Sequence, residues 1–197
     1  MEENFRNILT DNSEVLFDSL IDNELLKEIP IIGTSINLIK GIKSIRDKAY
    51  LNKIKYFLEN IGEINESQKK RLIEESKKDK KRRAKFGESL FTTLEKSDSL
   101  TKVEYLAVAF EAFLNLDIDD ADLRLICHAI NISYIDELIQ IVELKNVSEQ
   151  ILRYNVSSGL AIAVYRDLTV DMTNTQPDYK LSIAAEKLRA AWKKHKF

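Results

Sequence analysis

Few residues of this chain have the types and spacing that catalysis needs, and the first candidates are Arg124 and His128. They lie four positions apart, which places both side chains on one face of a helix. An arginine–histidine pair can serve phosphodiester hydrolysis, but a wider spacing and a surrounding pocket are expected for it. Cys127 and His128 form no nucleophile–base pair, because adjacent residues on a helix point apart. We therefore predict a chain without catalytic residues, in which His128 is packed beside Cys127.

The aspartate-rich segment 117–122 contains the residue type that binds Ca²⁺. An EF-hand loop needs glycine at its sixth position and glutamate at its twelfth, and these places hold Asp122 and His128. One cysteine and two histidines leave little material for another kind of metal centre. We predict that the chain holds no metal and no cofactor. The carboxylates instead favour the positive end of a helix that starts near residue 119 or 120.

A basic run at residues 77–85 is the strongest local feature of the sequence. Residues 69–85 hold 10 basic and 3 acidic side chains, a net charge of +7, whereas residues 86–150 have a net charge of −9. Clustered Lys and Arg can contact nucleic-acid phosphates or anionic lipid headgroups, or form a solvated helix face beside the acidic segment. The predicted phosphate- or lipid-contacting residues are Lys77, Lys78, Lys80, Lys81, Arg82, Arg83 and Lys85.

An apolar segment at residues 29–46 is the second candidate surface. It is apolar on more than one face, which is typical of the central helix of a bundle. It could also insert into a membrane after a conformational change, with its basic residues at the headgroups. Its longest nearly uncharged stretch, 11 residues from Ile29 to Ile39, is too short to span a bilayer. The residues predicted to face a membrane or a partner helix are Ile32, Ile36, Ile39 and Ile42.

Helical periodicity of the apolar residues predicts most of the elements that must position these surfaces. A first helix is expected over residues 13–28, which Pro30 ends, and a second one extends to about residue 60. Further helix starts are indicated by cap residues or by capping-box pairs. These are Asn65 with Gln68, Thr101 with Glu104, Asp119 or Asp120, Ser133 with Asp136, and Ser182.

The last fifty residues have a different pattern. Residues 158–165 favour a β-strand, and after a polar loop residues 179–181 are expected to pair back as a second strand. A final helix is predicted over residues 183–194, with Leu188 and Trp192 on its buried side. A hairpin followed by a terminal helix is typical of half of a winged-helix domain.

The composition agrees with a helical protein, because only 7 residues are Gly or Pro (5 and 2) and 44% are hydrophobic. We predict a mainly α fold in two parts. A multi-helix bundle occupies residues 1–145, and a small winged-helix-like α+β appendage, made of the hairpin and the last helix, occupies residues 146–197.

Three stretches resemble known proteins. Residues 28–34 and 44–48 resemble a motif of small uncharacterised bacterial proteins, and residues 100–138 resemble the helical pattern of TerB-like, tellurite-resistance-associated domains. Residues 158–160 and 179–182 are similar to a common winged-helix ending. TerB-like domains are acidic and all-helical, and they are implicated in stress response, membrane-linked complexes and phage defence. The resemblance therefore implies an interaction module that is no enzyme, and it assigns no functional residue.

These observations lead to three hypotheses about function. The first is a non-enzymatic, cytosolic bacterial interaction or regulatory protein in stress response or anti-phage defence, whose partner is a protein, either another copy or a different chain. The second is a membrane-active effector that uses residues 29–46 on an anionic membrane surface. The third is a nucleic-acid-binding regulator that uses the basic run or the tail. Residues 1–12 are acidic and polar, unlike a secretory signal, so we expect a cytoplasmic location, with membrane association as the alternative.

Overall fold

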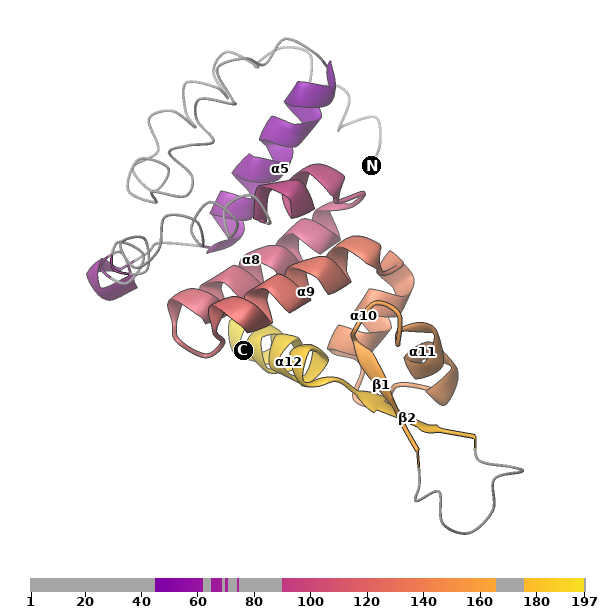
Figure 1. Ribbon diagram of the computed structural model, residues 1–197. Helices are drawn as coiled ribbons and strands as arrows, with labels where there is room; N and C mark the ends of the chain where they lie inside the picture. Colours follow the sequence, from indigo (N-terminus) through magenta and orange to yellow (C-terminus); the bar gives the residue numbers. More distant parts are fainter. Residues whose placement is uncertain are drawn as a thin grey trace. The chain divides into compact units, whose positions relative to one another are not determined.

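The computed structural model describes residues 45–61, 65–68, 70, 74, 90–165 and 176–196. The chain divides into two compact units, residues 1–96 and residues 97–197. The described parts are mainly helical, with a two-stranded antiparallel sheet near the C-terminus (Figure 1). This confirms the predicted fold class, a mainly α protein with a small α+β element.

The described part of the first unit is centred on α5, Ile45–Ile61, and a helical segment at residues 90–96. The Lys53 ammonium donates a hydrogen bond to the Glu95 carbonyl oxygen over 2.9 Å and connects the two helices. Apolar residues three or four positions apart are buried on α5, as amphipathic spacing requires. The buried apolar residues of these two helices are Leu51, Ile54, Phe57, Leu58, Ile61, Leu90, Phe91 and Leu94.

The helix predicted to end near residue 60 ends at Ile61, which confirms that boundary. The capping box at residues 65–68 is also present. The Asn65 backbone N–H donates to Gln68 Oε1 over 2.8 Å, and the Gln68 backbone N–H donates to Asn65 Oδ1 over 3.0 Å. The helix predicted at residues 13–28 lies outside the described residues.

The second unit is built around α8, Leu100–Leu114, which is buried over most of its length. Both α9, Asp120–Ile132, and α12, Ile183–Lys196, pack on α8 (Figure 1). The capping box predicted at Thr101 is wrong. Ser99 is extended and its Oγ accepts a hydrogen bond from the Lys102 backbone N–H, so the helix begins before Thr101.

The turn after α8 places Leu116 in the left-handed region, at φ 67°. This conformation costs a residue with a side chain about 1–2 kcal/mol. The side chain is 74% exposed, so burial of the leucine does not offset the cost. The turn is held by the Asp117 backbone N–H, which donates to the Ala112 carbonyl oxygen over 2.9 Å.

The next helix boundary differs from the prediction. Ser133 ends α9, because its backbone N–H donates to the Ala129 carbonyl oxygen over 3.0 Å. Tyr134 is therefore the N-cap of α10, Ile135–Glu143, and it makes no side-chain cap hydrogen bond. The predicted Ser133 cap is wrong, and α10 buries Leu138, Ile141 and Val142.

The tail contains α11, Glu149–Tyr154, and then the hairpin of β1, Ala161–Val164, and β2, Asp178–Leu181. The strands pair antiparallel, with Ala161 opposite Leu181 and Val164 opposite Asp178. The hairpin and its position before α12 are confirmed. The first strand is shorter than predicted, because a turn occupies residues 155–159 and places Gly159 at φ 80°.

The last helix begins as predicted, since Ser182 Oγ accepts a hydrogen bond from the Ala185 backbone N–H over 3.1 Å. Leu188 and Trp192 are buried, which confirms their predicted orientation. The boundary predicted between residues 145 and 146 lies inside the second unit, because α12 packs on both α8 and α10.

Candidate interaction site

The two surfaces predicted from the sequence lie outside the described residues. These are the seven basic residues between Lys77 and Lys85, and the four isoleucines Ile32, Ile36, Ile39 and Ile42. In the described parts of the chain, none of the helices combines the length and the apolar character that crossing a membrane requires.

The aspartate-rich segment forms the start of α9, as expected. Asp119 and Asp122 make a capping box, in which each side chain accepts from the backbone N–H of the other. Asp120 forms an ion pair with Arg124 one turn later. Across the described ranges, no three His, Cys, Asp or Glu side chains are placed so that they could hold a metal ion.

The remaining catalytic candidates also have other roles. Arg124 is engaged with Asp120, and Cys127 is buried in the core. His128 is exposed, so the expectation that it packs beside Cys127 is wrong. Although they are adjacent on α9, Cys127 lies in the core and His128 on the surface, so the thiol and the imidazole are apart.

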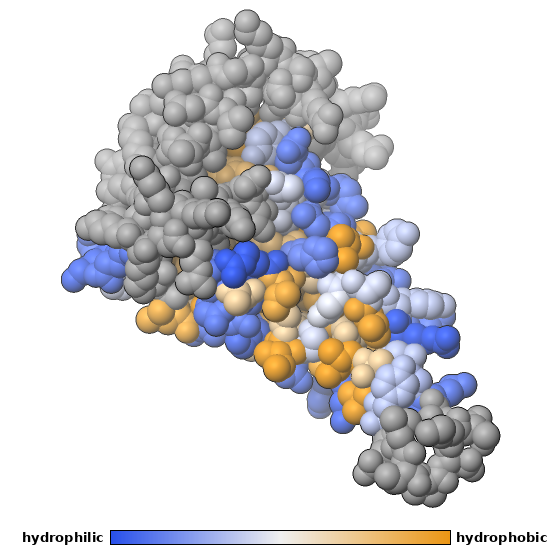
Figure 2. All heavy atoms as spheres, viewed as in Figure 1, coloured by the Kyte–Doolittle hydropathy of each residue, from blue (hydrophilic) through white to orange (hydrophobic). Residues whose placement is uncertain are grey.

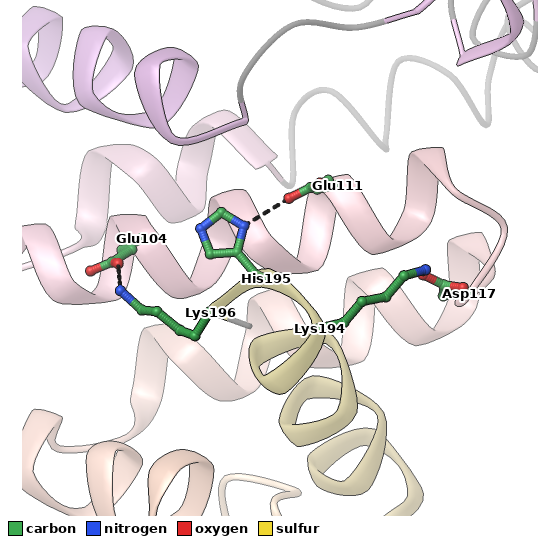
Figure 3. Close-up of polar contacts among 6 residues, drawn as sticks. All are labelled: Glu104, Glu111, Asp117, Lys194, His195 and Lys196. Carbon is green, nitrogen blue, oxygen red and sulfur yellow. Dashed lines mark hydrogen bonds and ion pairs between the residues drawn. The ribbon is translucent and has the colours of Figure 1, made fainter.

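The C-terminal turn of α12 carries a different cluster, which we name the ionic clasp (Figure 3). Three consecutive residues of α12 reach α8 and the turn that follows it. The pairs are Lys194 Nζ with Asp117 Oδ2 at 2.7 Å, His195 Nδ1 with Glu111 Oε2 at 2.9 Å, and Lys196 Nζ with Glu104 Oε1 at 2.7 Å.

A pocket of about 120 Å³ lies at the ionic clasp. His195 and Glu111 line it and are hydrogen bonded to each other, an arrangement that can move a proton. The other lining residues are Val108, Ala112, Asn115, Asp117, Ala191 and Lys194. Its four titratable residues are paired with one another, Lys194 with Asp117 and His195 with Glu111.

An aromatic contact lies beside the ionic clasp. Trp192 packs edge-on against Tyr105, with ring centroids 4.6 Å apart, and Lys196 Nζ lies 4.6 Å from the Trp192 ring centre. The buried Tyr105 hydroxyl donates to Glu143 Oε1 over 2.5 Å. Burial and this hydrogen bond raise the pKa of Tyr105 far above its ordinary value. The phenol is therefore a permanent donor that connects α8 to the end of α10.

Arg189 supplies a second connection between α12 and α10. Its Nη1 donates to the Ile141 carbonyl oxygen over 2.7 Å, and its Nη2 donates to the Leu144 carbonyl oxygen over 2.6 Å. These carbonyls lie at the C-terminal end of α10, where a helix leaves acceptors unpaired and favours a cation. The arginine thus has a structural role.

The opposite side of the unit is organised by buried Asn155, which follows α11. Its Nδ2 donates to Glu137 Oε2 over 2.8 Å and to the Ile151 carbonyl oxygen over 3.0 Å. Its Oδ1 accepts from Ser158 Oγ over 3.1 Å and from Ser133 Oγ over 3.5 Å. One amide therefore holds the start of α10, the end of α11 and the turn before β1 together.

The neighbours of Ser133 and Asn155 form an exposed surface, which we name the aromatic patch. Ser133 and Asn155 are buried and in contact, so the segments around residues 133 and 155 are adjacent, and the residues on either side of each are exposed. Their exposed fractions are 49% for Ile132, 78% for Tyr134, 57% for Tyr154 and 37% for Val156. Figure 2 shows hydrophobic residues on the molecular surface over α9 and on toward the hairpin.

The sequence analysis did not identify the aromatic patch. Tyr134 and Tyr154 each stand at a helix boundary beside a polar residue, Ser133 or Asn155. That local signal marks helix ends, and it is visible in the sequence. The contact between residues 22 positions apart, which brings the segments that carry the two tyrosines together, is a property of the fold alone.

Comparisons with protein-family models, with curated proteins and with solved structures find no match to this chain.

Proposed function

We propose that this chain is a non-catalytic interaction protein, and that its second unit binds another protein through the aromatic patch. From the resemblance to TerB-like domains we propose a role in bacterial stress response or anti-phage defence, and from the acidic, polar residues 1–12 we propose a cytosolic location. The observation that carries the proposal is the exposure of Tyr134 and Tyr154 on neighbouring segments. Tyrosine is enriched at protein interfaces, where it supplies a large apolar surface and a polar end.

The charged groups of the second unit support a protein partner over a chemical reaction. The ionic clasp and Arg189 are engaged in contacts between helices, and Asp119 and Asp122 cap α9. In the pocket at the ionic clasp Lys194 is paired with Asp117 and His195 with Glu111, so these charges already have partners within the fold.

Nucleic-acid binding through the tail has less support. On α11, Glu149 lies one turn before Arg153, where opposite charges offset each other. On β2, Asp178 lies two residues before Lys180. A surface that neutralises several phosphates needs an excess of basic side chains, and these two elements have none. The more basic α12 uses Lys187, Lys194 and Lys196 in ion pairs with Asp122, Asp117 and Glu104.

Site-specific photo-crosslinking in the native cell tests the proposal. A photoreactive phenylalanine analogue replaces Tyr134 in one variant and Leu116 in a matched control, which is similarly exposed at the other end of α9. Leu116 precedes α9 and Tyr134 follows it, and this helix of 13 residues is about 20 Å long. We expect a protein adduct from position 134 and none from position 116. Equal adducts at both positions, or none at position 134, would contradict the proposed function.

A further inference from the structure

We draw no further inference here: the strongest candidate, the exposed stripe that Ala121, Leu125, His128 and Ile132 form at helical spacing along one face of α9, carries nothing because nothing in the structure shows what covers it.

Discussion

The ionic clasp and the aromatic patch are both built from residues distant in the sequence. They differ in whether their side chains have partners within the fold. In the ionic clasp each of three basic residues of α12 has a carboxylate partner, and the adjacent Trp192 is buried against Tyr105. In the aromatic patch two tyrosines face solvent and Asp136 has no ion-pair partner among the described residues. The first region satisfies its groups within the fold, whereas the second leaves them available to another molecule.

The difference predicts where substitutions affect folding and where they affect binding. Variants in and around the ionic clasp should change the free energy of unfolding and leave the binding of a partner at the aromatic patch unchanged. Variants in the aromatic patch should weaken the binding of a partner and leave the free energy of unfolding nearly unchanged.

Truncation of Trp192 should have the largest effect. Trp192→Ala removes a buried aromatic side chain, and we expect the free energy of unfolding to fall by about 3–5 kcal/mol. Tyr134→Ala removes an exposed ring, and the expected change is within about 0.5 kcal/mol. Urea denaturation followed by circular dichroism measures both. A similar loss of unfolding free energy in the two variants would show that Tyr134 also stabilises the fold.

Loss of the Tyr105 hydroxyl should have an intermediate effect. Tyr105→Phe removes the hydrogen bond to Glu143, and we expect a loss of about 1–2 kcal/mol. Glu143 is exposed, so water can hydrate the released carboxylate and limit the cost. Trp192 is the only tryptophan and touches Tyr105, so its fluorescence reports unfolding of this unit. Tyr154→Phe is the matched control in the patch and should change nothing measurable.

Asp122, at the start of α9, should contribute about 1 kcal/mol to the free energy of unfolding, and this contribution should depend on pH. Burial disfavours its ionised form, but hydrogen bonds from Lys187 and from the Asp119 backbone outweigh burial and hold the pKa of Asp122 below its ordinary value. A carboxylate with a lowered folded pKa stabilises the protein above the ordinary pKa of about 4, and this stability is lost as the pH falls through the folded pKa.

Unfolding measurements between pH 3 and 7 test this contribution. The difference in unfolding free energy between wild type and Asp122→Asn should be largest near pH 6–7 and should shrink below about pH 4. Asp136→Asn, in the first turn of α10, is the control and should show a smaller difference at pH 7. A difference for Asp122→Asn that grows as the pH falls would contradict the assigned direction.

The sequence predicts elements whose signals are local. The caps at Asn65, Asp119 and Ser182 depend on hydrogen bonds that span three residues, and all three form as expected. The misplaced cap at Thr101 has a local explanation as well. Ser99 stands two positions earlier and is equally suited, and the extended backbone at residue 99 decides between them.

The candidate site depends on contacts that no local pattern reveals. Lys196 meets Glu104 across 92 positions, and Lys187 meets Asp122 across 65. The sequence indicates the opposite charges of residues 86–150 and 151–197, but it cannot assign the pairs. Exposure of Tyr134 and Tyr154 likewise follows from the inward direction of Ser133 and Asn155, which only the packed helices determine.

The smallest expected effect belongs to the ionic clasp itself. Lys194 is 63% exposed and Asp117 is 40% exposed, so water and salt screen their attraction. Lys194→Gln should therefore lower the free energy of unfolding by about 0.5 kcal/mol or less in low salt, and by nothing measurable in 1 M NaCl. Lys193→Gln, on the adjacent exposed residue, is the matched control.

A large loss of unfolding free energy in Lys194→Gln that persists in high salt would contradict this expectation. The three pairs would then act as one coupled network, in which removing one cation leaves its neighbours misaligned. A small, salt-sensitive loss would instead mean that the burial of Trp192 and Tyr105 holds α12 on α8. The ion pairs would then select the register between the two helices and add little to the strength of their contact.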